Sequence, residues 1–303
     1  MSRPDLTVVV DPDPSMNENL TDEYVSYYNP DRGDCDLTFK NCANLKTVWV
    51  TGFVKNIYFE DCPALEIIEG STEIPVSLSL VRSRPPLIST QVCSLSFDHC
   101  DLTDVTLPLS VTNLTIHDCQ GYDKIRIPEY VKTISLKNCE LPVETLPKVL
   151  TELILDNAII RGDLSHIYTA NLLIKNMPYF QLTTCSVEDI LLENVETLVI
   201  ERMPMCSRSV SIVNVNDLKL TTGKETNLRF LSLNKVKNAD VELCGFISSI
   251  MADECAFTKF KMLGLYEHRD VSDKCTGDDV VAFRVTGPLS GKRLPWDDAV
   301  IRQ

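Results

Sequence analysis

One short pattern of apolar positions repeats almost in phase along the middle of the chain. It reads Val92, Leu95, Phe97 and Cys100, then Val111, Leu114, Ile116 and Cys119, then Val131, Ile134, Leu136 and Cys139, then Leu150, Leu153, Leu155 and Ala158. The interval is 19 or 20 residues. A unit this short is too small to bury its own apolar face, so it must stack on its neighbours. The pattern therefore predicts a solenoid.

The second apolar position of each unit serves as an anchor that extends the register along most of the chain. The anchors are Leu37, Ile57, Leu78, Leu95, Leu114, Ile134, Leu153, Leu172, Ile190, Ile212, Leu231 and Ile250. Around them, apolar and polar residues alternate as they do in a half-buried strand. The register predicts about twelve coils, each contributing one strand to a common stack.

A second apolar pair lies between successive anchors and predicts a second extended side in each coil. The pairs are Val48 and Val50, Leu65 and Ile67, Val105 and Leu107, Ile125 and Ile127, Leu198 and Ile200, Leu218 and Leu220, and Val241 and Leu243. Two short strands and two turns leave no room for a helix within about twenty residues. The predicted fold is an all-β-rich solenoid of about 12 coils, with two extended sides per coil and little helix.

The ends of the chain depart from the repeat and predict three segments. Residues 1–33 are rich in Asp, Pro and Asn, and we expect them to form an N-terminal cap over the first strand edges. Residues 34–265 form the repeat solenoid, although its register weakens after Ile190, where Pro204 to Arg208 intrudes. The repeat is not recognisable from Tyr266, so residues 266–303 are assigned to a C-terminal cap that includes a strand at Val280 to Thr286.

The charge of the chain narrows the classes of partner. The formal net charge is -14, and nucleic-acid affinity comes largely from Lys and Arg displacing counterions. We therefore expect neither nucleic acid nor an anionic membrane as a partner. An acidic surface suits a basic protein segment, but charge also keeps a long repeat soluble, and both readings stay open.

The N-terminal residues and the cysteines predict a cellular location. The first 14 residues carry no apolar core of a signal peptide, and no apolar run is long enough to cross a bilayer. Of the 12 cysteines, five share one repeat position: Cys42, Cys62, Cys100, Cys119 and Cys139. Buried, reduced thiols at this position fit a reducing compartment. We expect a cytoplasmic protein, or one in the host cytoplasm or the virion if it is viral.

Two coils carry motifs that resemble leucine-rich repeats. Val92 to Leu102 reads V-x-x-L-x-F-x-x-C-x-L and Val131 to Leu141 reads V-x-x-I-x-L-x-x-C-x-L, with Cys at the position more often held by Asn. The Leu146-Pro147 entry into the next coil is similar to the short repeats of bacterial secreted effectors and of amoebae and their giant viruses. The resemblance implies a curved solenoid whose concave, strand-lined face binds proteins. It implies no enzymatic domain, because fewer than 40 residues follow Leu265.

Candidate catalytic or metal-binding chemistry is sparse. Asp98-His99-Cys100 and His117-Asp118-Cys119 lie one coil apart, but the thiols should point inward and the other ligands outward, so they would not converge on zinc. The four histidines (His99, His117, His166 and His268) are scattered, and no nucleophile or phosphate-loop motif is present. Acidic residues near one strand edge (Glu60, Asp61, Asp98, Asp118, Asp156 and Glu193) could suit polysaccharide cleavage, but Lys137 and Lys175 interrupt them. We expect no enzyme activity, no metal and no cofactor.

The outward residue between the two inward anchors changes character along the chain. It is Thr38, Tyr58, Ser79, Ser96, Thr115 and Ser135, and then Ile154, Leu173 and Leu191. Contiguous exposed apolar residues mark interaction sites, so these three predict a partner-binding patch with a polar rim of Glu152, Asp156, Lys175, Asp189 and Glu193. The competing interpretation is that the C-terminal tail or a loop covers them.

These features predict a non-enzymatic interaction or scaffold protein that binds a protein partner through the concave strand face. The alternative is a structural component of a larger assembly such as a viral particle, in which a stiff stack of coils bridges other subunits. A free binding module should purify as a monomer, whereas an assembly component should oligomerise or co-purify with a particle.

Overall fold

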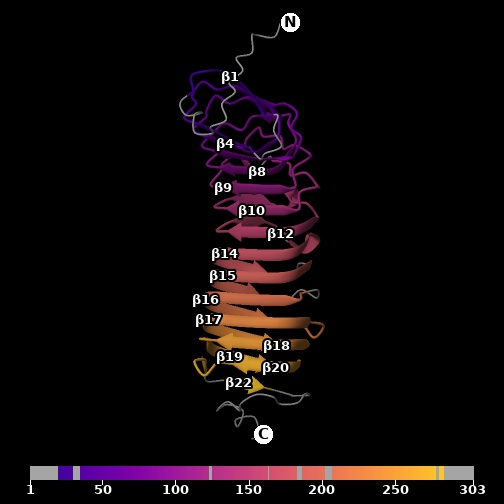
Figure 1. Cartoon of the computed structure of the whole chain (residues 1–303). Coiled ribbons are helices and arrows are strands. Elements are labelled where there is room, and N and C mark those ends of the chain that lie inside the picture. Colours follow the sequence, from indigo (N-terminus) through magenta and orange to yellow (C-terminus); the bar gives the residue numbers. More distant parts are fainter. Residues whose placement is uncertain are drawn as a thin grey trace. The chain divides into compact units, whose positions relative to one another are not determined.

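The chain is a parallel β-solenoid, as the repeat predicts. The computed structural model describes residues 20–29, 35–122, 125–162, 164–182, 186–201, 207–277 and 280–282. The coils number about 12, and 63% of the described residues are in strands and 3% in helices. Figure 1 shows the stacked strands. The coils fall into two compact units, an N-terminal unit of Met1–Pro147 with Ile159–Arg161 and a C-terminal unit of Lys148–Ala158 with Gly162–Gln303.

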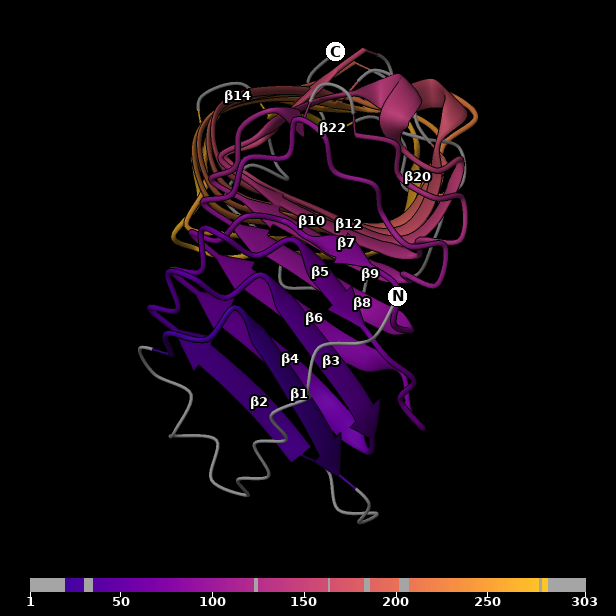
Figure 2. The same ribbon diagram turned by 90° about the horizontal axis from the view of Figure 1, so that it is seen from above.

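The N-terminal unit contains two main layers of parallel strands, visible in Figure 2. The anchor strands, which carry the repeat's inward anchors, are β2 (Cys35–Lys40), β4 (Val54–Glu60), β6 (Val76–Val81), β8 (Val92–Asp98), β9 (Asn113–His117) and β10 (Thr133–Lys137). The second layer contains β1 (Tyr24–Asn29), β3 (Thr47–Gly52), β5 (Ile67–Glu69) and β7 (Leu87–Ile88). A short parallel pair, β11 (Glu140–Pro142) with β13 (Ile159–Arg161), and the 3-10 helix η3 (Val143–Thr145) complete this unit.

In the C-terminal unit four strands are 13 to 17 residues long and bend around the coil. The strands of this unit are β12 (Val149–Asp156), β14 (Tyr168–Leu182), β15 (Ser186–Ile200), β16 (Ser209–Thr221), β17 (Asn227–Leu243), β18 (Phe246–Asp253), β19 (Ala256–Met262), β20 (Leu265–Val271), β21 (Thr276–Gly277) and β22 (Val280–Ala282), and the 3-10 helix η4 (Leu164–His166) lies before β14. β14 pairs with β15 from Tyr168 to Leu182, on both sides of the coil corner. One strand therefore supplies both extended sides that the sequence predicts.

The predicted register is confirmed over most of the observed strand pairings and is wrong at one anchor. Leu37 pairs with Ile57, Leu95 with Leu114, and Leu172 with Ile190, all inward positions of successive strands. Ile190, however, pairs with Val210. The predicted anchor Ile212 is the second inward residue of its strand, and it pairs with Leu192. Val210 and Ile212 are both fully buried, so apolar character alone could not distinguish them.

The second extended side is less regular in the N-terminal unit than the sequence predicts. Ile68, rather than Ile67, is the fully buried residue of β5. Around Leu107 and Ile127 the chain buries these apolar side chains without forming a strand. Pro108 and Pro128 follow these residues directly, and proline cannot donate to a β ladder. These coils therefore keep the core position and lose the second strand.

Most coils turn at one residue with a left-handed backbone, which lies directly after the anchor strand or, in β14 to β17, within the long strand. Twelve described non-glycine residues have φ between 44° and 56°: Asn41, Asp61, Arg82, His99, Asp118, Asn138, Asn157, Asn176, Asn194, Asn214, Lys235 and Glu254. The backbone amides of several of them donate to a carbonyl of the following coil, as Asp118 does to Lys137 at 2.9 Å. The corner thus turns the chain and adds to the stacking.

Parallel stacking continues past both predicted solenoid boundaries. β1, within the segment predicted to cap the N-terminus, pairs with β3. β20 pairs with β18, and Ile247 lies opposite Tyr266, the residue from which the repeat is unrecognisable in sequence. The predicted strand at Val280 to Thr286 corresponds to β22 over its first three residues, and the rest lies outside the described residues.

Candidate functional site

The predicted apolar residues form one column on the outward face of the C-terminal unit. Ile154 on β12 pairs with Leu173 on β14, and Leu173 pairs with Leu191 on β15. Neighbouring strands lie about 4.8 Å apart, so the three side chains are adjacent. We call these residues the apolar column. In the following strands the same position holds Ser211, Ser232 and Met251.

The residues of the apolar column point away from the core. Their sequence neighbours Leu153, Leu155, Leu172, Ile174, Ile190 and Leu192 are each no more than 2% exposed. By contrast, Ile154 and Leu173 are half-buried and Leu191 is 37% exposed. Alternation along each strand sets this orientation, because successive side chains point to opposite faces. Three aliphatic side chains therefore lie at the surface and do not pack into the solenoid core.

The predicted rim residues lie in two columns that flank the apolar column. The first flanking column contains Glu152, Asn171 and Asp189, two residues before each apolar position. The second contains Asp156, Lys175 and Glu193, two residues after it. The structure thus brings all eight predicted residues onto one face, with four carboxylates and one ammonium group around the aliphatic side chains.

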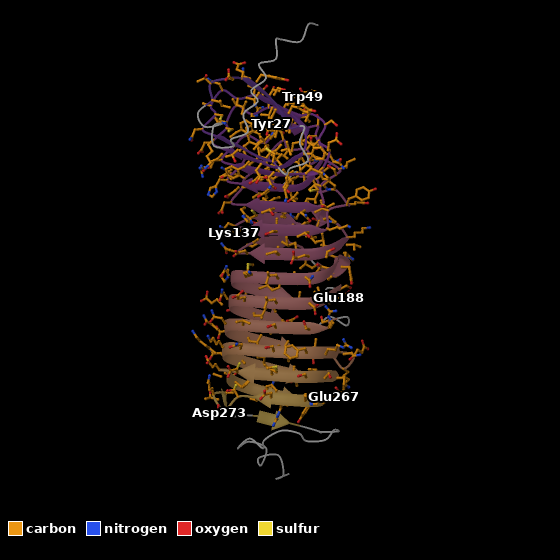
Figure 3. All side chains as sticks on the ribbon, viewed as in Figure 1. Tyr27, Trp49, Lys137, Glu188, Glu267 and Asp273 are labelled. Carbon is orange, nitrogen blue, oxygen red and sulfur yellow. The ribbon has the colours of Figure 1, made fainter. Side chains whose placement is uncertain are left out.

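Hydrogen bonds and ion pairs fix part of this rim. Arg208 forms an ion pair with Asp189, and the Ser209 hydroxyl donates to the same carboxylate at 2.7 Å. These partners hold the pKa of Asp189 below its ordinary value, chiefly through the hydrogen bond from Arg208. The Tyr168 hydroxyl donates to Glu188, which Figure 3 labels on this unit. Asp189 therefore stays ionised at neutral pH and presents a fixed negative charge.

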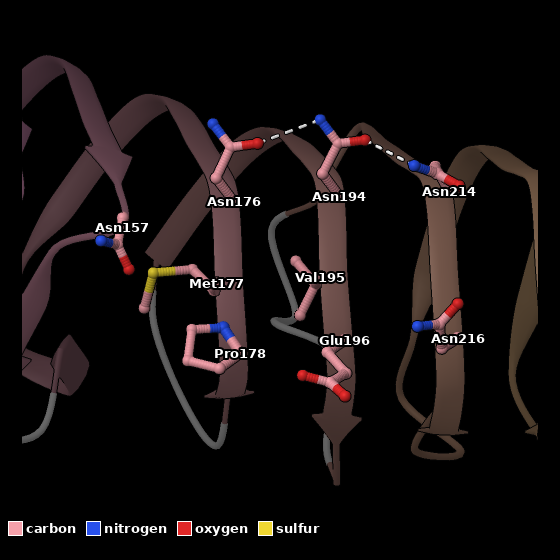
Figure 4. Close-up of a pocket in the computed structure, with 9 residues that line it drawn as sticks. All are labelled: Asn157, Asn176, Met177, Pro178, Asn194, Val195, Glu196, Asn214 and Asn216. Carbon is pink, nitrogen blue, oxygen red and sulfur yellow. Dashed lines mark hydrogen bonds between the residues drawn. The ribbon is translucent and has the colours of Figure 1, made fainter.

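A ladder of asparagines runs along the left-handed corner beside the second flanking column. Asn214 donates to Asn194 at 2.7 Å and Asn194 to Asn176 at 3.1 Å (Figure 4). Asn176 in turn donates to Asp156 at 2.6 Å. The ladder lines a shallow groove of about 540 Å³. The alternation of apolar and polar positions does not predict this ladder. The sequence does mark it, since an Asn or Asp comes directly before an inward residue in most coils, as in Asn41-Cys42 and Asn138-Cys139.

Three of the side chains considered for metal binding do come together, without His117 and without the cysteines. Ligand atoms of Asp98, His99 and Asp118 lie within 4.8 Å of one another. His99 Nδ1 lies 2.7 Å from an Asp98 oxygen, and Asn138 donates to Asp118 at 2.6 Å. Cys100 and Cys119 are buried, as predicted. The group has the His to Asp pairing expected of a polar surface, and the side chains of His99 and Asp98 are 57% and 38% exposed.

The cysteines at the repeat position form an inward column in the N-terminal unit. All ten described cysteines are free thiols. The Sγ atoms of the five cysteines at the repeat position donate to main-chain carbonyls, as Cys139 does to Ile116 at 3.3 Å. Burial raises the pKa of the Cys139 thiol, and it raises that of Cys255 to about 11. These two thiols are therefore protonated at neutral pH, which makes them poor nucleophiles and poor metal ligands. Cys100 differs, because its hydrogen bond with Cys119 lowers the pKa of its thiol to about 7.

The N-terminal unit contains a larger surface groove, of about 840 Å³, between its coil corners and its second layer. Arg82 and Arg84 line it, together with Asp101, Asp104 and Glu66. Arg84 forms an ion pair with Glu66 at 3.6 Å, and Arg82 binds Asp61 at 2.8 Å. The charges of this groove are largely matched within the protein, so it offers no strong preference for either sign of ligand.

Comparisons with known proteins leave the function to be argued from these residues. No protein-family model matches the chain, and no curated protein and no solved structure is significantly similar to it. Among the described residues, no helix has the length and apolar character needed to cross a membrane.

Proposed function

We propose that this protein is a non-enzymatic interaction protein that binds a protein partner through the face carrying the apolar column. The observation that supports the proposal is the register of Ile154, Leu173 and Leu191, which places three surface aliphatic residues in one line. Folding explains the inward residues of these strands but not these three. Burying them against a partner would contribute about 1.5–3 kcal/mol each by transfer from water, and such apolar centres usually outweigh rim charges.

Two finer points belong to the same proposal. The motifs at Val92 to Leu102 and Val131 to Leu141 support a kinship with short leucine-rich repeats, whose strand-lined faces bind proteins. The free, mostly buried thiols support a reducing location, the cytoplasm or the host cytoplasm. Mass spectrometry of thiols labelled under denaturing conditions, in protein taken from its native source, tests the location. Extensive disulfide pairing there would contradict it.

The binding proposal is tested by replacing the apolar column with the residue type found at the same position in other coils. The triple variant Ile154→Ser/Leu173→Ser/Leu191→Ser should fold, because Ser79 and Ser135 occupy equivalent positions of the N-terminal unit. Wild-type and variant proteins would be immobilised and exposed to extract of the native source, and the retained proteins identified by mass spectrometry. We expect at least one partner that the wild type retains and the triple variant loses.

A matched control is Thr115→Ala, on the outward face of the N-terminal unit, which should leave partner retention unchanged. Circular dichroism and urea unfolding report whether the triple variant folds. If it unfolds, another part of the chain covers the column, and the proposal is wrong. If it folds and retains every partner, the interface lies elsewhere.

A further inference from the structure

We propose that the partner segment that docks on this face is a basic amphipathic α-helix lying along the apolar column, across the strands. This inference rests on the proposed function, because it specifies the partner of the same face. It follows from three features of the described residues: the spacing of the column, the charges on both of its sides, and the effect of those charges on self-association.

The spacing of the column matches a helix better than an extended strand. Successive coils place Ile154, Leu173 and Leu191 about 4.8 Å apart, so the column spans about 9.6 Å. Two turns of an α-helix advance about 10.8 Å and bring three side chains of one stripe to the same face. An extended strand would need about 13.4 Å for three side chains on one face. The helix stays in step with the column to about 1 Å, and the strand does not.

The flanking columns match the sides of such a helix in distance and in charge. Each lies two residues from the apolar column, about 6.7 Å away along the strand, close to the 5–6 Å radius of a helix with its side chains. Four of their six residues are acidic: Glu152, Asp156, Asp189 and Glu193. Lys175 and the Arg208 partner of Asp189 offset only part of this charge. Lys and Arg on both sides of an apolar stripe would complement the face.

The same charges disfavour a second copy of the chain as the occupant. A two-fold axis along the column would place Glu152 opposite Asp156 and Asp189 opposite Glu193. A two-fold axis across the column, through Leu173, would place Asp156 opposite Glu193 and Lys175 opposite Lys175. Like charges that face each other across an interface oppose association. Both symmetric arrangements are therefore disfavoured, whereas a basic helix meets opposite charges on each side.

Synthetic peptides test the inference directly. The first peptide is a labelled helix of about 18 residues, about five turns, with Leu at i, i+4, i+7 and i+11 and with Lys and Arg beside this stripe. The second has Glu in place of the basic residues, and the third scrambles the first so that the stripe is lost. Fluorescence anisotropy at low salt measures their binding to the full chain. We expect the first peptide to bind about tenfold or more tightly than the other two, and to gain helicity on binding.

Two sets of variants locate the binding. The triple variant Ile154→Ser/Leu173→Ser/Leu191→Ser should weaken the basic peptide by about tenfold or more. The variant Glu152→Gln/Asp156→Asn/Glu193→Gln should also weaken binding of the basic peptide. Its affinity for this peptide should depend less on salt concentration than that of the wild type. The matched control Glu196→Gln/Glu201→Gln/Glu225→Gln removes three exposed charges from the same unit, away from the two flanking columns. We expect this control to bind like the wild type.

The outcomes separate this inference from the proposed function. If the scrambled peptide binds as well as the helical one, or if the column variants bind like the control, binding is unspecific attraction to an acidic protein and the inference is wrong. Column-dependent dimers in sedimentation would also overturn it. A native partner that needs the column but docks through an acidic or extended segment would refute the helix and leave the proposed function intact. A native partner that ignores the column would refute both.

Discussion

The residue at each coil corner determines how the chain passes from one strand to the next. A left-handed backbone costs most L-residues about 1–2 kcal/mol, and Asn and Asp tolerate it better because their short side chains bond locally. Eight of the twelve corner residues are Asn or Asp. The exceptions are Arg82, His99, Lys235 and Glu254. Arg82 is held by two ion pairs, so its position has a compensating interaction.

Lys235 offers a test of this account. Its φ is 56°, its side chain is exposed, and its corner follows that of Asn214 in the next coil. Lys235→Asn should raise the free energy of unfolding by about 0.5–1 kcal/mol, because it relieves the backbone strain. Urea unfolding measures the change. The opposite change at another corner, Asn194→Lys, should destabilise the protein, since it adds backbone strain and breaks the asparagine ladder. A destabilised Lys235→Asn would show that backbone strain is not the controlling term.

The buried thiols predict a response to alkaline pH. Burial raises the pKa of Cys255 from its ordinary 9.0 to about 11. The thiol is then neutral in the folded state where it would ionise in the unfolded chain. The stability linked to this group is fully present below pH 9, and is lost as the pH rises from there towards 11. Urea midpoints measured from pH 8 to about pH 11 should fall more steeply for the wild type than for Cys255→Ala. Ala158 shows that alanine is accepted at the equivalent position of another coil. Equal slopes would exclude Cys255 as a source of the alkaline loss.

At the scale of the strand, the sequence predicts most of what the structure contains, because a period of two and a repeat of about twenty residues constrain each inward position. Leu95, Leu114 and Ile134 lie in register as expected. The predicted anchor Ile212 is two residues from the observed one, Val210. Both residues are buried, so only the pairing with Ile190 distinguishes them. The left-handed corner residues are harder to predict, because four of the twelve are neither Asn nor Asp and obscure the pattern. Strand alternation and register place the apolar column and its two flanking columns on one face, whereas a partner leaves no such periodic signal in the sequence.

The inward positions should govern the stability of each strand. Leu136 on β10 is fully buried, and it pairs with Ile116 on β9. Leu136→Ala should therefore lower the free energy of unfolding by about 2–5 kcal/mol, through lost burial and the cavity left behind. Thr115→Ala, on the outward face of β9, should change it by less than about 0.5 kcal/mol. Chemical unfolding of both variants checks the contrast. Similar losses would mean that the inward and outward faces are wrongly assigned.

At the scale of the whole molecule, the net charge of -14 acts on folding and on binding with opposite signs. Self-repulsion destabilises a compact acidic chain, so screening it should stabilise the fold. Attraction between the acidic face and a basic helix is screened by the same salt, so binding should weaken. Raising NaCl from about 20 to about 200 mM shortens the Debye length several-fold. We expect the urea midpoint to rise and the affinity for the basic peptide to fall in parallel measurements. The same change in salt acts on the urea midpoint and on the affinity. If both fall, favourable ion pairs such as Arg82 with Asp61 outweigh the net repulsion in the folded chain. An affinity that does not respond to salt would mean that the apolar column alone binds the helix, without its acidic flanks.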